Sequence, residues 1–420
     1  MKKIKAIPVL TSLLLICTIS LSLWGCSTEI RAADLMDGIE ARDIPLKDSI
    51  GDNNADVTDF ALRLLKSTAN SGENTLISPL SIICALAMTA NGADGETLSQ
   101  METVFGMSAA ELNTYLHTYL SRLPEGKKYK LSVANSIWFT DDVRFTVNKD
   151  FLQTNADYYG ADIYKSEFST RQTLIDMNNW VKQETDGMIP KAVDEIPPDA
   201  IMYLVNALAF ESEWSDVYEH RQVQNGKFNK EDGTVQRVDM MYSSEGRYIE
   251  DENAVGFIKY YVAHKYAFVA LLPHDGITVS EYIEGLDGET LNALISEAEF
   301  ATVNAAIPKF ETEYDTDLSG VLSTMGMTDA FDPREADFGR LGGSDAGNIS
   351  ISRVIHKTHI QVGEKGTKAG AVTVVETKDR GTGPVEDPKE VHLDRPFIYM
   401  IIDCENNIPL FMGIMNDVKA

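Results

Sequence analysis

Apolar residues recur at helical spacing in two early stretches of the chain. The first stretch predicts that the folded domain begins with an amphipathic helix near residue 54. The second runs from Ser78, a suitable N-cap followed by Pro79, to Ala90. Because this second stretch is apolar on nearly every face, we expect its helix to run through the middle of the protein. The spacing of the first stretch is carried by Val57, Phe60, Ala61, Leu64 and Leu65.

Runs rich in β-branched and aromatic residues predict strands along the rest of the chain, and helical patterns separate them. No repeat, low-complexity tract or linker divides the chain after about residue 54, so we expect one large α+β domain over residues 54–420. The strand-like runs lie at residues 133–139, 202–210, 266–272, 303–310, 397–403 and 408–415. The helical patterns lie around residues 97–123, 147–159, 172–187, 278–297 and 316–326.

The first residues have the pattern of an export signal. Three lysines precede an apolar run over residues 7–24, which ends in Leu23-Trp24-Gly25-Cys26. This tetrapeptide resembles the bacterial lipobox, so residues 1–25 are expected to be a lipoprotein signal peptide and Cys26 the lipidated N-terminus. An ordinary cleaved signal or an uncleaved membrane helix also fits. The acidic residues 26–53 are expected to be a flexible tether, with the domain at the outer face of the cell membrane or secreted.

Composition and charge narrow the functional classes. The formal net charge is −27, so binding to nucleic acid is not expected, and a solvated acidic surface accounts for most of the charge. Of the four cysteines, Cys84 and Cys404 would remain after processing. Both lie in apolar runs, which favours packing over reactivity, although a disulfide between them stays open. Cysteines and histidines do not cluster with metal-ligand spacing, so neither a metal nor another cofactor is expected.

The histidines lack the sequence contexts of hydrolases. None of the seven lies in a Gly-x-Ser-x-Gly or His-Glu-x-x-His arrangement, the patterns typical of serine and zinc hydrolases. We therefore do not expect the chain to be an enzyme.

Several separated segments resemble, in order, the signature segments of the serpin family. Each alone would be weak, but together they span nearly all of residues 54–420, and coincidence does not explain their order. The first are residues 74–81 (NTLISPLS), 131–138 (LSVANSIW) and 179–181 (NWV) with Thr185 and Gly187. The others are 204–207 (LVNA) with Phe210 and Trp214, then 308–310 (PKF), 325–331 (MGMTDAF), 356–357 (HK), 364–367 (EKGT), 395–397 (RPF) and 411–413 (FMG).

The resemblance implies a fold of three β-sheets and about nine helices with an exposed reactive loop near residues 364–395. It also implies a monomeric suicide-substrate inhibitor of serine proteases, with cysteine proteases as a second class. The target begins to cleave the loop, the loop enters the largest sheet as a new strand, and the covalent acyl-enzyme is trapped. A non-inhibitory binding, storage or chaperone-like lipoprotein with the same fold is the alternative.

The residues of the loop suit strand insertion. If residues 366–377 become a strand, alternate side chains face the core, and a slip by one residue would bury charges. The inward set, the odd-numbered residues from Thr367 to Thr377, is uncharged and contains no large side chain. The outward set, the even-numbered residues beginning with Lys368, carries the charges. Lys368 and Val372 depart from the family pattern, but both face outward. The hinge that the resemblance implies consists of Glu364, Gly366, Thr367, Ala369, Ala371 and Thr373.

Two further groups of residues match positions that the family uses to control the sheet. A polar shutter beneath the central strands is implied at Ser78, Ser81, Asn206 and His356. A breach, where insertion begins, is implied at Trp214, Lys309 and Glu364, with an ion pair between the last two. A satisfied core histidine is the simpler interpretation of His356, but its eight-residue spacing to Glu364 fits the family.

Counting from the hinge places the scissile bond at Arg380-Gly381. An arginine before the cut favours a trypsin-like protease, whose acidic pocket would pair with the guanidinium. The segment from Gly381 to Arg395 is about five residues longer than is usual in the family, so the cut could instead follow a residue such as Lys378, Thr382 or Val385. Arg380 would then be a solubilising loop residue.

Overall fold

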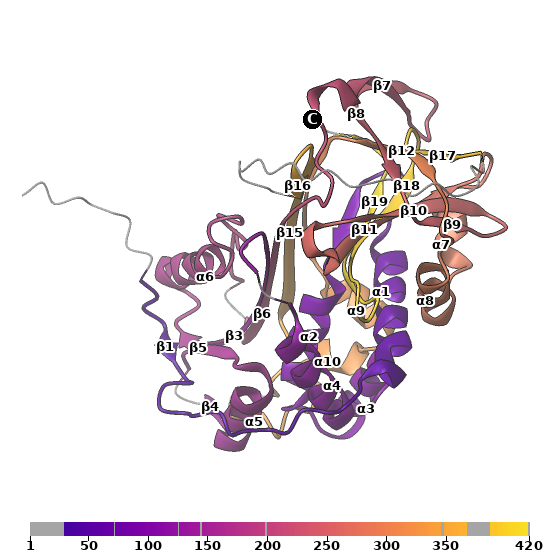
Figure 1. The fold of residues 1–420 in the computed structure, drawn as a ribbon. Helices are drawn as coiled ribbons and strands as arrows, with labels where there is room; N and C mark the ends of the chain where they lie inside the picture. The colour runs from indigo at the N-terminus through magenta and orange to yellow at the C-terminus, as the bar shows by residue number, and fades with distance from the viewer. Residues whose placement is uncertain are drawn as a thin grey trace, which may run out of the picture.

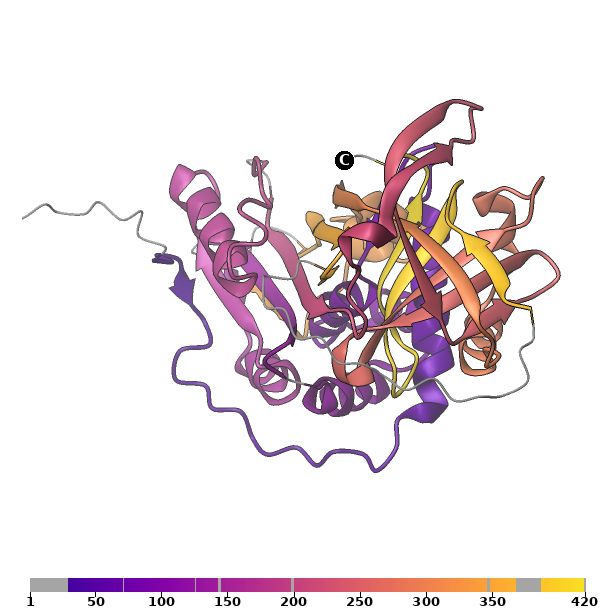
Figure 2. The same cartoon turned by 45° about the horizontal axis from the view of Figure 1, so that its top comes forward.

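The computed structural model describes residues 29–367 and 387–418, except for 71, 125, 143–144, 198–199 and 346–347. Within this part the chain forms ten α-helices, three large β-sheets and a two-stranded ribbon, which confirms the predicted α+β class with one helix more than expected (Figures 1 and 2). None of these helices is long and apolar enough to cross a membrane.

The α-helices are α1 (Asn54–Thr68), α2 (Pro79–Ala90), α3 (Gly95–Phe105), α4 (Ala109–Arg122), α5 (Lys149–Tyr159), α6 (Arg171–Glu184), α7 (Val279–Glu284), α8 (Gly288–Ser296), α9 (Ser319–Met325) and α10 (Thr328–Phe331). Short 3₁₀ turns lie at η1 (Gly51–Asn53), η2 (His220–Gln222) and η3 (Val262–His264).

The largest sheet, sheet A, has the strand order β1 (Ala33–Asp34), β5 (Asp162–Ser166), β3 (Tyr129–Thr140), β6 (Met202–Glu213), β16 (Gly366–Thr367), β15 (Arg353–Gly363) and β13 (Phe310–Asp317). Sheet B has the order β2 (Thr75–Ile77), β19 (Pro409–Met415), β18 (Phe397–Asp403), β11 (Tyr266–Pro273), β10 (Ala254–Tyr260) and β9 (Tyr248–Glu250). Sheet C has the order β17 (Lys389–His392), β12 (Val303–Pro308), β8 (Val235–Glu245) and β7 (Val223–Asn229), and the ribbon pairs β14 (Gly342–Ser344) with β4 (Phe145–Val147).

Helix α2 runs through the core, as its sequence predicts. The Ser78 side chain accepts a hydrogen bond from the Ser81 N–H, and Pro79 occupies the first turn. All residues of the helix are buried, because sheet A lies on one side and sheet B and neighbouring helices lie on the others. The helix therefore holds Ser78 and Ser81 directly behind the central strands of sheet A.

Several predicted elements differ from the structure at their boundaries, and three of them are helices. The helical pattern at 97–123 is two helices, because Gly106 adopts a left-handed conformation at the end of α3 and Ser108 begins α4 with a capping box. The pattern at 278–297 likewise divides into α7 and α8. The expected helix at 316–326 begins only at Ser319, because the alternating residues before it form β13.

The two faces of sheet A are covered differently. On the inner face, even-numbered residues of β6 such as Leu204 and Leu208 belong to the main core. On the outer face, odd-numbered residues such as Tyr203 and Val205 form a second apolar cluster with Trp180 of α6. Helix α6 therefore covers the outer face of the sheet (Figure 1).

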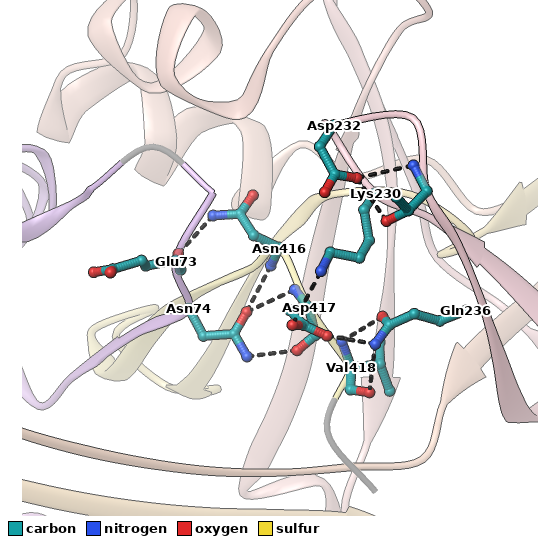
Figure 3. A network of polar contacts seen from close by, with 9 residues as sticks. Glu73, Asn74, Lys230, Asp232, Gln236, Asn416, Asp417 and Val418 are labelled. Atoms are coloured by element: carbon teal, nitrogen blue, oxygen red, sulfur yellow. Dashed lines mark hydrogen bonds and ion pairs between the residues drawn. The ribbon is translucent and has the colours of Figure 1, made fainter.

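Residues 416–418 are held between the residues before β2 and the strands β7 and β8. The Asn74 side chain accepts hydrogen bonds from the N–H groups of Asn416 and Asp417, each at 2.8 Å, and donates to the Asp417 carbonyl (Figure 3). Lys230, in the turn before β8, and Gln236 of β8 both donate to the Asp417 carboxylate. Residues 416–418 thus join the start of sheet B to the end of sheet C formed by β7 and β8, called here the β7–β8 ribbon.

Residues 30–50 form a strap along the body of the domain, whereas the sequence had suggested a flexible tether. Strand β1 pairs antiparallel with β5 at the edge of sheet A, and the strap then continues to α1 (Figure 2). Arg42 donates from Nε and Nη2 to Asp157 of α5, at 2.9 and 2.5 Å. Burial alone would raise the pKa of Asp157, but the hydrogen bonds from Arg42 lower it, so the carboxylate is charged.

We expect Arg42→Ala to lower the melting temperature by several degrees, because it leaves the buried Asp157 carboxylate without its cation. The double variant with Asp157→Asn should recover part of the loss, because the uncompensated charge is then gone. Thermal unfolding followed by circular dichroism measures both. A single variant as stable as the unmodified protein would show that the strap contributes nothing through this pair.

Candidate functional site

The four predicted shutter residues meet in one buried hydrogen-bond network. His356 Nδ1 lies 2.6 Å from Asn206 Oδ1, and His356 Nε2 accepts from the Ser78 N–H at 3.1 Å. Ser81 Oγ also donates to Asn206 Oδ1, at 3.1 Å. Since Nε2 accepts, Nδ1 must carry the proton that it donates to Asn206, so the ring is a neutral imidazole.

Burial keeps His356 neutral and leaves one neighbouring donor unsatisfied. His356 is fully buried, and desolvation lowers its pKa to about 3. The Asn206 Nδ2 group is also buried and has no partner among the described residues. Asn135, directly opposite Asn206 on β3, was not assigned a role from the sequence, but its amide can donate to the Ser81 carbonyl at 2.9 Å. The acceptors of this network are therefore nearly all paired, whereas one buried donor, the Asn206 Nδ2 group, has no partner among the described residues.

The shutter sits where β6 and β15 still pair directly. These strands pair in parallel between Tyr203–Ala207 and Arg353–Lys357, with His356 opposite Asn206. Above this stretch they are separated by β16, which pairs with both. Sheet A is thus closed at the shutter and already open at one end.

The first hinge residues already occupy that open end. Gly366 pairs with Gly363 of β15 and Glu213 of β6, and Thr367 pairs with Val362 and Ser212. Gly366 has φ +150°, and a Cβ there would collide with the Ser212 carbonyl oxygen, so only glycine fits. Glu364 and Lys365 make the two-residue turn between β15 and β16.

Thr367 is buried beneath an aromatic stack at the breach. Its Oγ1 lies 2.5 Å from the Tyr261 hydroxyl, and the Tyr261 ring stacks on Trp214 with 4.3 Å between centroids. Trp214 Nε1 donates to the Gly363 carbonyl at 2.8 Å. The sequence gave no signal for Tyr261, because it lies 106 positions from Thr367 and only the packing of sheet B against sheet A joins them.

The predicted ion pair at the breach is present. Lys309 Nζ lies 2.9 Å from Glu364 Oε1. Burial opposes ionisation of Glu364, but the hydrogen bond from Lys309 lowers its pKa. Both side chains are more than a third exposed, so the pair adds under about 1 kcal/mol and positions the hinge turn instead.

A second, buried ion pair supports Trp214 and was not anticipated from the sequence. Lys259 is 1% exposed, and its Nζ lies 2.8 Å from Glu245 Oε1. The same ammonium lies over the ring of Trp214 and over that of Tyr218, at 5.3 and 4.5 Å from their centroids. Burial would lower the pKa of Lys259, but Tyr218 and Glu245 raise it, so the cation persists beneath the breach.

Several predicted site residues lie outside the described part of the chain. They are Ala369, Ala371, Thr373, Arg380, Gly381 and Cys26. Cys84 and Cys404 are both free, which answers the open question of a disulfide between them. Within the described residues, no group of three or more His, Cys, Asp or Glu side chains could hold a metal ion.

We expect the stability of the protein to fall as the pH falls from 6.5 towards 3. The folded pKa of His356, about 3, lies below the ordinary value of 6.5, so in this window the unfolded chain binds the proton and the folded chain does not. At pH 5 this contributes a loss of about 2 kcal/mol. Urea unfolding at pH 7.5 and 5 should show a smaller pH effect in His356→Asn than in the control His359→Asn. Equal pH effects in both variants would contradict a neutral buried His356.

Comparison with known proteins agrees with this architecture. The family model described as Serpin (serine protease inhibitor) matches residues 55–418. An uncharacterized serpin-like protein of Thermococcus kodakarensis is 29% identical over 86% of this chain and 85% of its own length. The native structure of tengpin, a thermophilic serpin, has a TM-score of 0.88 and 48% identity, covering 93% of this chain and all of tengpin.

A more distant structure has the same fold. Human thyroxine-binding globulin, in complex with thyroxine, has a TM-score of 0.78 and 23% identity, covering 88% of this chain and all of that one. The family match extends over nearly the whole of the domain, and the chain therefore belongs to the serpin family.

Proposed function

We propose that this chain is a suicide-substrate inhibitor of serine proteases. The observation that carries the proposal is β16: the hinge has begun to enter sheet A between β6 and β15, with Thr367 facing the core. This is the orientation that the alternation of the loop sequence requires. A loop that served only as a connector would not need a place in the sheet.

Continuing the register of β16 supports the insertion of the rest of the loop. Each further residue of the loop would face one residue earlier on both β6 and β15. Thr373 would then lie between Asn206 and His356, which already face each other, so the two flanking registers agree. A threonine hydroxyl there could accept from the unsatisfied Asn206 Nδ2.

The same register gives partners to the charged residues of the loop. Lys368 would lie opposite Glu211 on the outer face of the sheet, and Glu376 would lie opposite Arg353. Lys368 departs from the family pattern, but in this chain an acidic side chain on β6 would receive it. Insertion would thus bury the uncharged inward set and match both outward charges.

The chemistry follows from the cleavage of the loop by the target. The protease serine attacks the carbonyl carbon of Arg380, the amide bond to Gly381 breaks, and the new amine of Gly381 leaves. The acyl ester to Arg380 then travels with the inserting loop. The sixteen residue-to-residue steps from Glu364 to Arg380 extend over about 50 Å at about 3.3 Å per step, which moves the enzyme away from its docking position before water can attack the ester.

The alternative is a protein of the same fold that binds a ligand without inhibiting a protease. It is supported by the fold alone, which this chain shares with thyroxine-binding globulin. The uncharged inward residues of the loop and the paired hinge favour inhibition. We also propose that Cys26 carries a lipid after removal of residues 1–25. The monomeric domain would then act at the outer face of the cell membrane, joined to it through the strap.

We expect trypsin-like proteases to form a complex that survives SDS, and elastase-like proteases to form less. The reason is that an acidic primary pocket would select Arg380. Mass spectrometry of the released C-terminal peptide identifies the bond, and Arg380→Ala should reduce trapping of trypsin-like enzymes far more than of elastase-like ones. Unchanged trypsin trapping by that variant would place the scissile bond elsewhere.

We expect Ala369→Arg to convert the inhibitor into a substrate. Position 369 would face the core after insertion, and an unpaired buried guanidinium costs several kcal/mol. Gly370→Arg is the matched control, because that side chain would face outward beside His359. Thr367 is less suitable, since it is already buried before cleavage.

The readout is the number of inhibitor molecules consumed per protease molecule inactivated, together with the covalent complex on a denaturing gel. Ala369→Arg should be cleaved at a similar rate but release active protease, whereas Gly370→Arg should remain an inhibitor. If both variants form complexes at near one-to-one stoichiometry, insertion through this hinge is not the mechanism.

A further inference from the structure

A cleft lies beside the hinge, between the β7–β8 ribbon and the ends of β13 and β15. It contains two adjoining cavities of about 900 and 580 Å³, which share Asn225 and Arg237 as walls. The larger volume is within the range of about 300 to 1,000 Å³ that small-molecule sites occupy. Its apolar wall is formed by Val238, Phe310, Val362 and Val418, all buried.

Two unpaired cations stand side by side at the rim. Lys227 and Arg237 are directly opposite each other in the β7–β8 pairing, and both are exposed. Within the described part of the chain, neither forms an ion pair or side-chain hydrogen bond. Like charges at directly opposed positions of a sheet repel, so the ribbon is destabilised by keeping this pair without an anion.

Two of the three carboxylates that line the larger cavity already have partners of their own. Glu364 is bound by Lys309 and Glu311 by His359. Lys365, at the tip of the hinge turn, makes no ion pair among the described residues. Asp239 is the one carboxylate lining the larger cavity that also makes none among them. Among the described residues that line the two cavities, three cations (Lys227, Arg237 and Lys365) therefore lack a carboxylate partner, and one carboxylate (Asp239) lacks a cation.

We propose that this cleft binds an amphipathic organic anion. Its carboxylate would lie between the walls that carry Arg237 and Lys365, and its apolar body would cover Phe310 and Val238. The basic rim provides charge-assisted hydrogen bonds, and the apolar wall provides the area that a small inorganic anion could not use. Because Lys365 belongs to the hinge turn, a bound anion would also stabilise the uncleaved protein.

Octanoate is a suitable probe, with octan-1-ol and inorganic phosphate as ligands that each lack one half of its chemistry. Isothermal titration of the purified protein should show one octanoate bound per chain, and both control ligands should bind at least about tenfold more weakly. Arg237→Glu should weaken octanoate binding by about tenfold or more. Arg171→Glu is the matched control, an exposed arginine on α6 outside the cleft, and should leave binding unchanged.

Lys365→Glu is a second variant on the opposite wall, for the case that Arg237→Glu perturbs the ribbon. Circular dichroism establishes that each variant is folded, and loss of octanoate binding in either folded variant supports the site. The proposal fails if octanoate does not bind, if octan-1-ol binds as tightly, or if both variants bind as the unmodified protein does. The titration involves no protease, so its result is independent of the inhibitory function.

Discussion

The direct pairing of β6 with β15 around His356 and Asn206 is the contact on which the rest of the structure depends. It is the one place where the two central strands of sheet A touch, because β16 separates them above. The pairing is held from behind by Ser78 and Ser81 of the buried helix α2. If the loop inserts as we propose, the entering strand must break this contact, and the strength of the contact would then oppose insertion.

This contact closes sheet A, but one of its buried polar groups has no partner among the described residues. A neutral imidazole donates to Asn206 and accepts from Ser78, which satisfies both of its nitrogens. The Asn206 Nδ2 group nevertheless remains without a partner among the described residues, and an unsatisfied buried donor costs on the order of 1–3 kcal/mol. The closed sheet therefore retains a local cost that a suitable additional strand could remove.

At the open end of sheet A, the breach residues hold the hinge turn in place. Trp214, stacked on Tyr261 and supported by the buried Lys259, fixes the carbonyl of Gly363, and Tyr261 holds Thr367 in the sheet. Gly366 and Thr367, which follow the hinge turn, already have the geometry of a strand, so the insertion that we propose would extend an existing strand. The exposed pair of Lys309 and Glu364 contributes orientation to this turn and little stability.

The sequence by itself determined the fold class, helix α2 and most of the strand runs, and its resemblance to the serpin family indicated the candidate shutter and breach residues, which the structure brings together. These follow from local periodicity and from motifs, which depend on neighbours in the chain. It could not determine that residues 30–50 form a strap, because this polar acidic segment is held by contacts with residues far away in the chain, such as the pairing of β1 with β5 and the ion pair of Arg42 with Asp157. Nor could it divide helices at Gly106 or extend β13, since boundaries depend on backbone conformation and on partner strands. Tertiary structure alone joined Tyr261 to Thr367 and Lys259 to Trp214, because these residues lie far apart in the chain and meet only where β10 and the residue after it pack against the end of β6 and β16.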